Sequence, residues 1–349
     1  MNFYLHICTF LFIFASHYSC NEASTNQNPS AKIKKGNALL GPTTITRSIK
    51  QDKQGNLLLA SYEGIMRFDG SSFVNITKEA GLDTCYAFDV LEDTKGNIWI
   101  ASNLLGAFRY DGKDFTQFTT KEGLAHDRLL QVYEDQNGKI WFTTQDGLSC
   151  YDPESGQFQN LTTKEGLTNN DVNCILQDRL GKYWIGTRGD ACLYDGNTFT
   201  KLTDEEGQPF QSVVSIIEDQ KGNIWLGGKD GLWRYNPNLD QSAITKFTSI
   251  GVTCVFEDNQ GNIWTNTNGW IDKQQSNPHS WVLSRYDEQT LSKKAPAPTQ
   301  IHKAKGMFFG IFEDKNEHIW VGTLDGVFRY DVNTINHFKP ALPLVKPES

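Results

Sequence analysis

Histidines near carboxylates are the residues of this sequence that could act as acids or bases. His126, His279 and His302 fall in predicted loops, and the carboxylates Glu63 and Asp127 fall in loops of the same kind. General acid–base catalysis needs such a base within hydrogen-bond reach of a partner, which sequence alone does not establish. The chain shows no serine-nucleophile motif, metal-ligand spacing or phosphate-binding loop. We therefore assign no catalytic residue, metal site or cofactor, and keep a His–carboxylate enzyme as an alternative.

Aromatic and polar side chains gather in the same predicted loops. Polar and charged groups can hydrogen-bond to sugar hydroxyls, while an aromatic ring can stack on the apolar face of a sugar. The candidate ligand-binding residues are Tyr86, His126, Arg128, Arg188, Asp190, Phe210, Trp270, His279, His302 and Lys305. Together they predict binding of a small polar ligand, such as an oligosaccharide.

Two unusual segments place the expected ligand site in the C-terminal third of the chain, in the last two of the seven sequence repeats described below. Residues 266–280, NTNGWIDKQQSNPHS, form an expanded loop that carries Trp270, a tryptophan outside the repeated pattern. Residues 291–306, LSKKAPAPTQIHKAKG, form a long basic connection with His302 and Lys305. Because functional residues concentrate on loops held by a rigid scaffold, we expect the ligand to bind beside these two segments.

A repeated pattern of aspartate and tryptophan supplies the elements that must hold these loops. The aspartate recurs about every 40 residues, and the sixth unit is longer. Six of the nine tryptophans follow six residues after their aspartate, and the first unit has Leu58 at that place. The seven aspartates are Asp52, Asp93, Asp135, Asp178, Asp219, Asp258 and Asp314. Several short apolar segments at this period are typical of propeller blades.

The pattern predicts an all-β fold, a seven-bladed β-propeller of four-stranded antiparallel blades over residues 43–341. Each unit reads as strands a, b, c and d in chain order, and strand a should line the central channel. The first unit begins with strand a and the last ends with strand d, so no strand need be exchanged to close the ring. The d–a and b–c connections share one face, and the candidate ligand-binding residues lie there.

Most of the recurring residues should build the scaffold. We expect each aspartate to accept hydrogen bonds from N–H groups of its own a–b turn, and each repeat tryptophan to lie between blades. Strand c of five units carries an arginine that we expect to pair with a carboxylate near the a–b turn of its own blade: Arg67, Arg109, Arg234, Arg285 and Arg329. Four of the five cysteines after residue 20 fall in predicted strands and should act as small hydrophobic residues.

The N-terminal residues predict export. Residues 1–20 contain an apolar run that suits a signal peptide, and small residues precede Cys20, the expected site of lipidation. Residues 21–42 should be a flexible tether and residues 342–349 a tail. No later apolar run is long enough to span a bilayer. We expect a periplasmic or outer-membrane-anchored lipoprotein that meets the membrane only through its lipid. The net charge of −8 disfavours nucleic acid as a partner.

The run V-x-x-I-x-E-D-x-x-G-N-I-W-x-G-T-x-D-G-L-x-R-Y-D resembles the two-component regulator propeller repeat. The resemblance covers about residues 43–340 and implies the fold of the extracytoplasmic sensor regions of hybrid histidine kinases, some of which sense oligosaccharides. It also implies a membrane-bound signalling or transport protein as a partner. The sequence shows one propeller and no kinase segment, so the resemblance does not tell how a bound ligand would be signalled. A weaker similarity to streptogramin lyases implies enzymes with His, Glu and magnesium at the propeller mouth, and none of their positions is carried over.

Three functions fit this sequence. The leading interpretation is an exported ligand-binding propeller of the sensor type. A protein-interaction scaffold would instead use the rim or a face, and would be marked by an apolar patch. A lyase-like enzyme would need a histidine and a carboxylate that meet over the channel.

Overall fold

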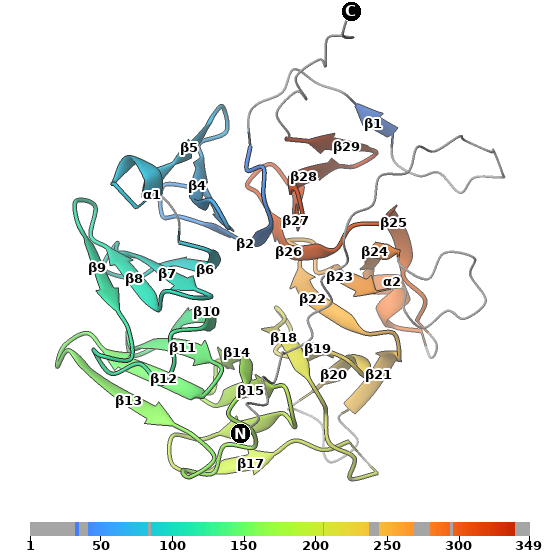
Figure 1. Ribbon diagram of the computed structural model, residues 1–349. Helices are drawn as coiled ribbons and strands as arrows, with labels where there is room; N and C mark the ends of the chain where they lie inside the picture. The colour runs from blue at the N-terminus through green and yellow to red at the C-terminus, as the bar shows by residue number, and fades with distance from the viewer. Residues whose placement is uncertain are drawn as a thin grey trace, which may run out of the picture. The chain divides into compact units, whose positions relative to one another are not determined.

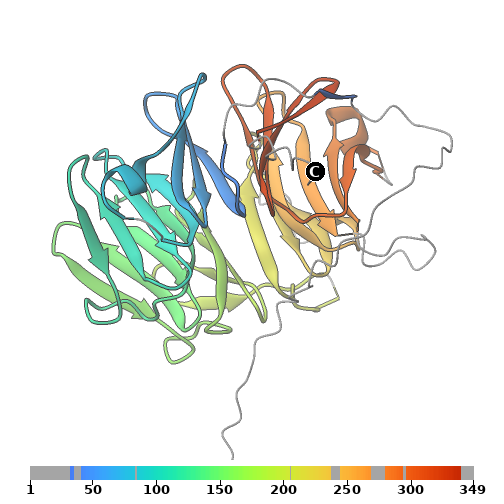
Figure 2. The ribbon, with the colours of Figure 1, turned by 45° about the horizontal axis from the view of Figure 1, so that its top comes forward.

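The computed structural model describes residues 32–34, 41–82, 85–204, 206–236, 244–268, 280–293 and 296–338. These residues all belong to one compact unit, Ala31–Ser349. Within it, seven four-stranded sets of consecutive strands stand as blades around a common axis, with one added strand on the last blade (Figures 1 and 2). The predicted seven-bladed propeller is therefore confirmed.

Each blade follows the predicted order a–b–c–d, with every neighbouring pair antiparallel. The innermost strands, a, are β2 (Thr46–Gln51), β6 (Ala87–Glu92), β10 (Leu129–Glu134), β14 (Val172–Gln177), β18 (Val213–Glu218), β22 (Val252–Glu257) and β26 (Phe308–Glu313). Strands b are β3 (Leu57–Ser61), β7 (Ile98–Ser102), β11 (Ile140–Thr144), β15 (Tyr183–Thr187), β19 (Ile224–Gly228), β23 (Ile263–Asn268) and β27 (Ile319–Thr323).

The outer strands complete the blades. Strands c are β4 (Gly64–Phe68), β8 (Ala107–Tyr110), β12 (Gly147–Asp152), β16 (Cys192–Tyr194), β20 (Gly231–Tyr235), β24 (Trp281–Tyr286) and β28 (Gly326–Asp331). Strands d are β5 (Phe73–Asn75), β9 (Phe115–Phe118), β13 (Gln157–Leu161), β17 (Phe199–Lys201), β21 (Ile244–Thr248), β25 (Thr299–Ala304) and β29 (Thr334–His337). Two one-turn helices, α1 (Ile76–Glu79) and α2 (Glu288–Leu291), lie in connections.

The repeated aspartate joins the a–b turn to the buried tryptophan. In the fifth blade, Asp219 Oδ1 accepts from the N–H groups of Lys221 and Asn223, at 3.0 and 2.8 Å. Its Oδ2 accepts from Asn223 Nδ2 at 2.7 Å and from Trp225 Nε1 at 2.8 Å. The aspartate–indole bond recurs at 2.7–2.8 Å in the other five blades that carry this tryptophan. The role in the turn is as predicted, and the bond to the indole is an addition to it.

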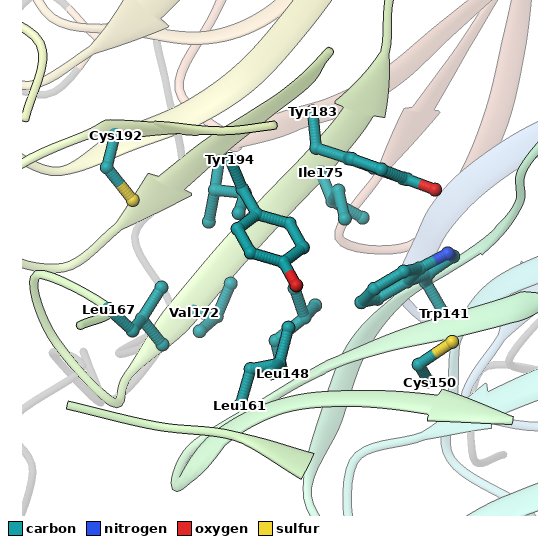
Figure 3. Packing of buried hydrophobic residues seen from close by; sticks show 11 residues of the cluster. Trp141, Leu148, Cys150, Leu161, Leu167, Val172, Ile175, Tyr183, Cys192 and Tyr194 are labelled. Atoms are coloured by element: carbon teal, nitrogen blue, oxygen red, sulfur yellow. The ribbon is translucent and has the colours of Figure 1, made fainter. Parts of the chain in front are cut away.

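The tryptophans lie between blades, as predicted. Figure 3 shows Trp141 of β11 beside Tyr183 of β15 in the next blade, and their ring centres are 5.0 Å apart. The Tyr183 hydroxyl donates to Asp135 Oδ2 at 2.8 Å, so the same carboxylate binds a tryptophan of its own blade and a tyrosine of the next. Both faces of each sheet are thus covered, which explains why strand b is apolar at successive positions.

The strand c arginines contradict our ion-pair prediction. The guanidinium carbons of Arg109, Arg234, Arg285 and Arg329 lie 5.7–5.8 Å from the ring centre of the repeat tryptophan in their own blade. The repeat aspartate, which is the carboxylate of the a–b turn itself, already accepts the indole N–H, and the cation stacks on the ring. Arg329 is the exception among the described residues: it lies 3.8 Å from Asp331, which also contacts His318 of the a–b turn of the same blade at 3.8 Å, as the prediction expected.

The cysteines behave as predicted. Cys150, Cys174 and Cys192 lie buried in β12, β14 and β16, and Cys254 lies partly buried in β22. Burial raises the pKa of the Cys150 and Cys174 thiols to about 12, which makes them poor nucleophiles at neutral pH.

The ring closes in whole blades. The seventh blade takes all four of its strands, β26 to β29, from the C-terminal end, and the first takes β2 to β5. Across the seam, the Trp320 ring lies 5.2 Å from Phe68, and Ile45 forms a parallel bridge with Gly326. Outside β29, the strand β1 (Lys32–Lys34) adds in parallel, so part of the segment that we expected to be a tether extends the last sheet. The predicted signal peptide, Cys20 and the tail lie outside the described residues.

Candidate functional site

The face with the d–a and b–c connections holds most of the residues predicted to bind ligand. Trp270 and His279 lie outside the described residues, so the expected site in the sixth and seventh blades stays a prediction. Arg188 and Asp190 stand on the b–c hairpin of the fourth blade and are engaged in ion pairs. Arg188 Nε contacts Asp171 at 2.8 Å, and Asp190 contacts Lys201 Nζ at 2.6 Å. These pairs join the hairpin to the d–a connection before β14 and to strand β17 of the same blade.

His302 corrects our placement of the basic connection. It lies in β25, which is strand d of the sixth blade, and not in a loop. Its ring centre is 5.7 Å from Phe308 and 5.4 Å from Phe328, in the contact between the sixth and seventh blades. Both aromatic neighbours belong to the seventh blade, and their rings account for the burial of the His302 side chain. Lys305 follows this strand and is exposed.

We predict that His302 makes stability depend on pH. Burial, and then the nearby His337, lowers the pKa of His302 to about 4, whereas an unfolded histidine titrates near 6.5. The unfolded state therefore binds the proton first, so this stability is complete above pH 6.5 and is lost as the pH falls toward 4. Urea unfolding should show the wild type losing up to about 3 kcal/mol more than the His302→Phe variant over this window. Equal losses in the two proteins would contradict the prediction.

Tyr86, His126 and Arg128 lie in d–a connections, as predicted. Arg128 is exposed, and its backbone N–H donates to His126 Nδ1 at 2.9 Å. Burial raises the pKa of the nearby Asp171, and the charges of Arg188 and His126 oppose the shift. No hydrogen bond between a histidine and a carboxylate occurs on this face within the described ranges. The histidine–carboxylate contact that does occur, His318 Nδ1 to Asp314 Oδ2 at 3.1 Å, belongs to an a–b turn on the other face.

A hollow of about 500 Å³ lies beside the fifth blade and involves one of the predicted residues. Phe210 is itself buried, and its ring meets the edge of Trp233 with centres 5.0 Å apart. Lys246 Nζ lies 4.4 Å from the centre of the same indole. The hollow is lined by Asp204, Gln208, Pro209, Phe210, Lys229, Asp230, Trp233, Lys246 and Ser249.

Sequence reasoning missed Trp233 and Lys246, although a signal for the tryptophan exists. The residue before the arginine in strand c is Trp233 here, and Met66, Phe108, Ser284 or Phe328 in the corresponding strands. A tryptophan that breaks the repeat pattern is a candidate for function. The indole is partly exposed, so it offers the hollow an aromatic wall beside carboxylates and ammonium groups.

A second group of residues stands at the axis. Each strand a is irregular at its second residue, which pairs with nothing in strand b; in β26 the interruption also includes the third residue, Gly310. The first residue of every strand a is buried, while the second is partly or fully exposed. These second residues are Arg47, Phe88, Leu130, Asn173, Val214, Thr253 and Phe309. Their variety among otherwise uniform neighbours was the signal that sequence reasoning overlooked.

Aromatic side chains extend this axial group toward the connection face. The Tyr62 ring, from the b–c turn of the first blade, stacks on Phe88 with centres 5.8 Å apart and meets the edge of Tyr86 at 5.9 Å. Tyr86 is 39% exposed and holds a left-handed backbone with φ of 45°. Its carbonyl oxygen accepts from Asn103 N–H, at 3.2 Å, in the b–c turn of the second blade.

Comparison with known proteins identifies the repeat. Residues 166–189 and 207–230 match the family model of the two component regulator propeller. Two segments, in the fourth and fifth blades, thus match this repeat. No curated protein sequence matches this chain.

The propeller is also similar to solved structures. The extracellular domain of a putative hybrid two component system from B. thetaiotaomicron has a TM-score of 0.69 and 24% identity, over 88% of this chain and 42% of that one. This chain therefore spans less than half of that structure. Virginiamycin B lyase from Staphylococcus aureus has a TM-score of 0.62 and 14% identity, over 84% and 96% of the two chains. PorZ, a surface component of the type-IX secretion system of Porphyromonas gingivalis, has a TM-score of 0.61 and 15% identity, over 84% and 48%. At sequence identities this low, the structural similarity shows a shared fold and nothing more.

Across the described ranges, no group of three or more His, Cys, Asp or Glu side chains is placed to hold a metal ion. In the same part of the chain, neither helix has the length and apolar character needed to cross a bilayer.

Proposed function

We propose that this propeller is an exported sensor-type module that binds a small polar ligand, such as a glycan fragment, in the hollow of the fifth blade. The observation that carries the proposal is the partly exposed Trp233 beside Lys246, Asp204 and Asp230. An indole face can cover the apolar face of a sugar ring, and the charged groups can hydrogen-bond its hydroxyls. A hollow that is formed before the ligand arrives also binds at a low ordering cost.

Export and the sensor role rest on similarity. The extracellular domain of the putative hybrid two component system from B. thetaiotaomicron shares the propeller, and the N-terminal sequence suits a signal peptide followed by an acylated Cys20. A membrane-bound signalling or transport protein is the proposed partner that would read the bound state. The alternative of an interaction scaffold would need a contiguous apolar patch, whereas in the described part of the chain the exposed large apolar residues belong to several different blades.

Removing the indole should weaken binding. With cellotetraose, maltotetraose and xylotetraose as calorimetric probes, Trp233→Ala should raise the dissociation constant of the bound tetrasaccharide by about 5- to 150-fold, on the scale of a truncated binding anchor. The unfolding curve should change little, because Trp233 is only partly buried.

A matched control is Trp281→Ala, which removes a partly buried tryptophan from strand c of the sixth blade. It should leave the affinity unchanged. A loss with Trp281→Ala and none with Trp233→Ala would move the site to the sixth blade, where the sequence alone placed it. Failure of all three tetrasaccharides to bind the wild type would contradict the glycan assignment.

A further inference from the structure

Arg47 places a cation at the axis of the ring. It is the bulged second residue of β2, and its guanidinium carbon lies 4.1 Å from the ring centre of Phe88 and 4.7 Å from that of Phe309. These rings come from β6 and β26, the inner strands of the two neighbouring blades. The cation is thus held between three blades by cation–π contacts, and the bulge directs its side chain away from the interior of the sheet.

The described neighbours of the guanidinium are aromatic rings. Among the residues that the structure describes, no hydrogen bond or ion pair of Arg47 is found. The acids of the adjoining segments are engaged elsewhere. Glu63 Oε1 accepts from Thr43 N–H at 2.9 Å, and Asp89 pairs with Lys50 Nζ at 3.0 Å. The N–H edges of Arg47 are therefore available to a ligand.

The group keeps its charge at neutral pH. Enclosure at the axis lowers the pKa of Arg47 to about 10, an effect that Tyr62 opposes. A pKa near 10 leaves the side chain protonated at pH 7. A partly dehydrated cation with an unused fork of donors is suited to a planar acceptor with two oxygens.

The neighbouring positions indicate how much negative charge the site can match. The six other second residues of the inner strands are Phe88, Leu130, Asn173, Val214, Thr253 and Phe309, and none carries a charge. A dianion such as phosphate would keep one charge without a partner in this enclosed place, which is costly. A monoanionic carboxylate matches the single guanidinium in both charge and shape.

We propose that Arg47 is the receptor for the carboxylate group of a small ligand that enters along the axis from the connection face. Phe88, Tyr62 and Tyr86 form an aromatic wall on the path from that face, against which the body of the ligand can pack. This axial site is separate from the hollow of the fifth blade and does not depend on the function proposed there.

Sodium glucuronate and glucose form a matched pair of probes, because they differ in the carboxylate. Saturation-transfer NMR titrations of the wild type at pH 7 should give a dissociation constant for glucuronate about tenfold or more below that for glucose. Arg47→Gln should raise the glucuronate constant to the level of glucose. Arg47→Lys should fall between the two, because it keeps the charge and loses the fork.

Two variants serve as controls. Arg67→Gln removes an exposed arginine from β4 of the same blade, and Trp233→Ala removes the wall of the fifth-blade hollow. Both should keep the preference for glucuronate, so the experiment tests the axial site independently of the proposed site in the fifth blade. Near-ultraviolet circular dichroism checks the fold of each protein. If Arg47→Gln does not fold, Arg47→Lys decides, and an unchanged preference there overturns the proposal. Equal binding of glucuronate and glucose by the wild type, or no binding of either, overturns it as well.

Discussion

Replacing Trp225 with alanine should lower the free energy of unfolding by about 3–5 kcal/mol, the range for a buried large aromatic residue. Trp225 is fully buried, its ring lies 4.8 Å from Phe247 and 5.7 Å from the guanidinium carbon of Arg234, and its indole N–H binds Asp219. The substitution leaves a cavity between two blades and removes the surface on which the arginine stacks. Urea unfolding followed by circular dichroism measures the effect.

The first blade suggests the matched control. Leu58 occupies the position of the repeat tryptophan there and is fully buried. Trp225→Leu should therefore cost clearly less than Trp225→Ala, since leucine fills part of the cavity. A loss below about 1 kcal/mol for the alanine variant would show that the blades close the cavity, and would contradict rigid packing between them.

Removing the carboxylate that binds this indole should have an effect of similar size. Asp219 is 4% exposed and accepts four hydrogen bonds, from two turn N–H groups, Asn223 Nδ2 and Trp225 Nε1. Asp219→Ala leaves these donors without an acceptor, and we expect it to cost about 3–5 kcal/mol, as for a broken buried charged network.

Asp219→Asn separates charge from shape. Its amide oxygen can still accept from the turn, but its NH₂ group faces donors on the other side, so we expect a loss between zero and that of the alanine variant. The same denaturation assay compares the three proteins. Asn and Ala variants of equal stability would indicate that the carboxylate acts through its charge and not through its hydrogen bonds.

The fold was predictable because each repeat carries the same residues at the same spacing, and these residues form the same turns and contacts. The aspartate, turn glycine, tryptophan and Asp-Gly hairpin recur in register, so one misread unit is corrected by the others. Arginine partners were not predictable in this way. The ion-pair prediction did not consider that Asp219 and its equivalents, the carboxylates of the a–b turns, bind the indole six residues later, nor that the indole face offers the arginine a partner.

The site was predictable only in outline. Loops were expected on the correct face, but His302 showed that a polar residue in a long connection can lie in a strand and in a blade contact. Arg47 and Trp233 were missed because both sit inside repeated strands, where we assumed scaffold roles. For Arg47, the bulge in β2 decides which side of the strand the side chain faces. The sequence signal of this bulge is one position that differs from repeat to repeat while its neighbours stay similar.

The seam between the seventh and first blades has a consequence for how such a chain can change. Each of these blades takes its strands a to d from one end of the chain, and among the described strands only the added β1 crosses from the N-terminal end to the last blade. The break in covalent connection therefore lies at the boundary between two units. New termini could be opened between any two other blades, and the old ones joined, without cutting a sheet. Gain or loss of one unit by recombination would likewise leave every remaining blade intact and alter only the angle between neighbours. A chain built this way can evolve by whole units, while its single-copy residues, such as Arg47, diverge one at a time.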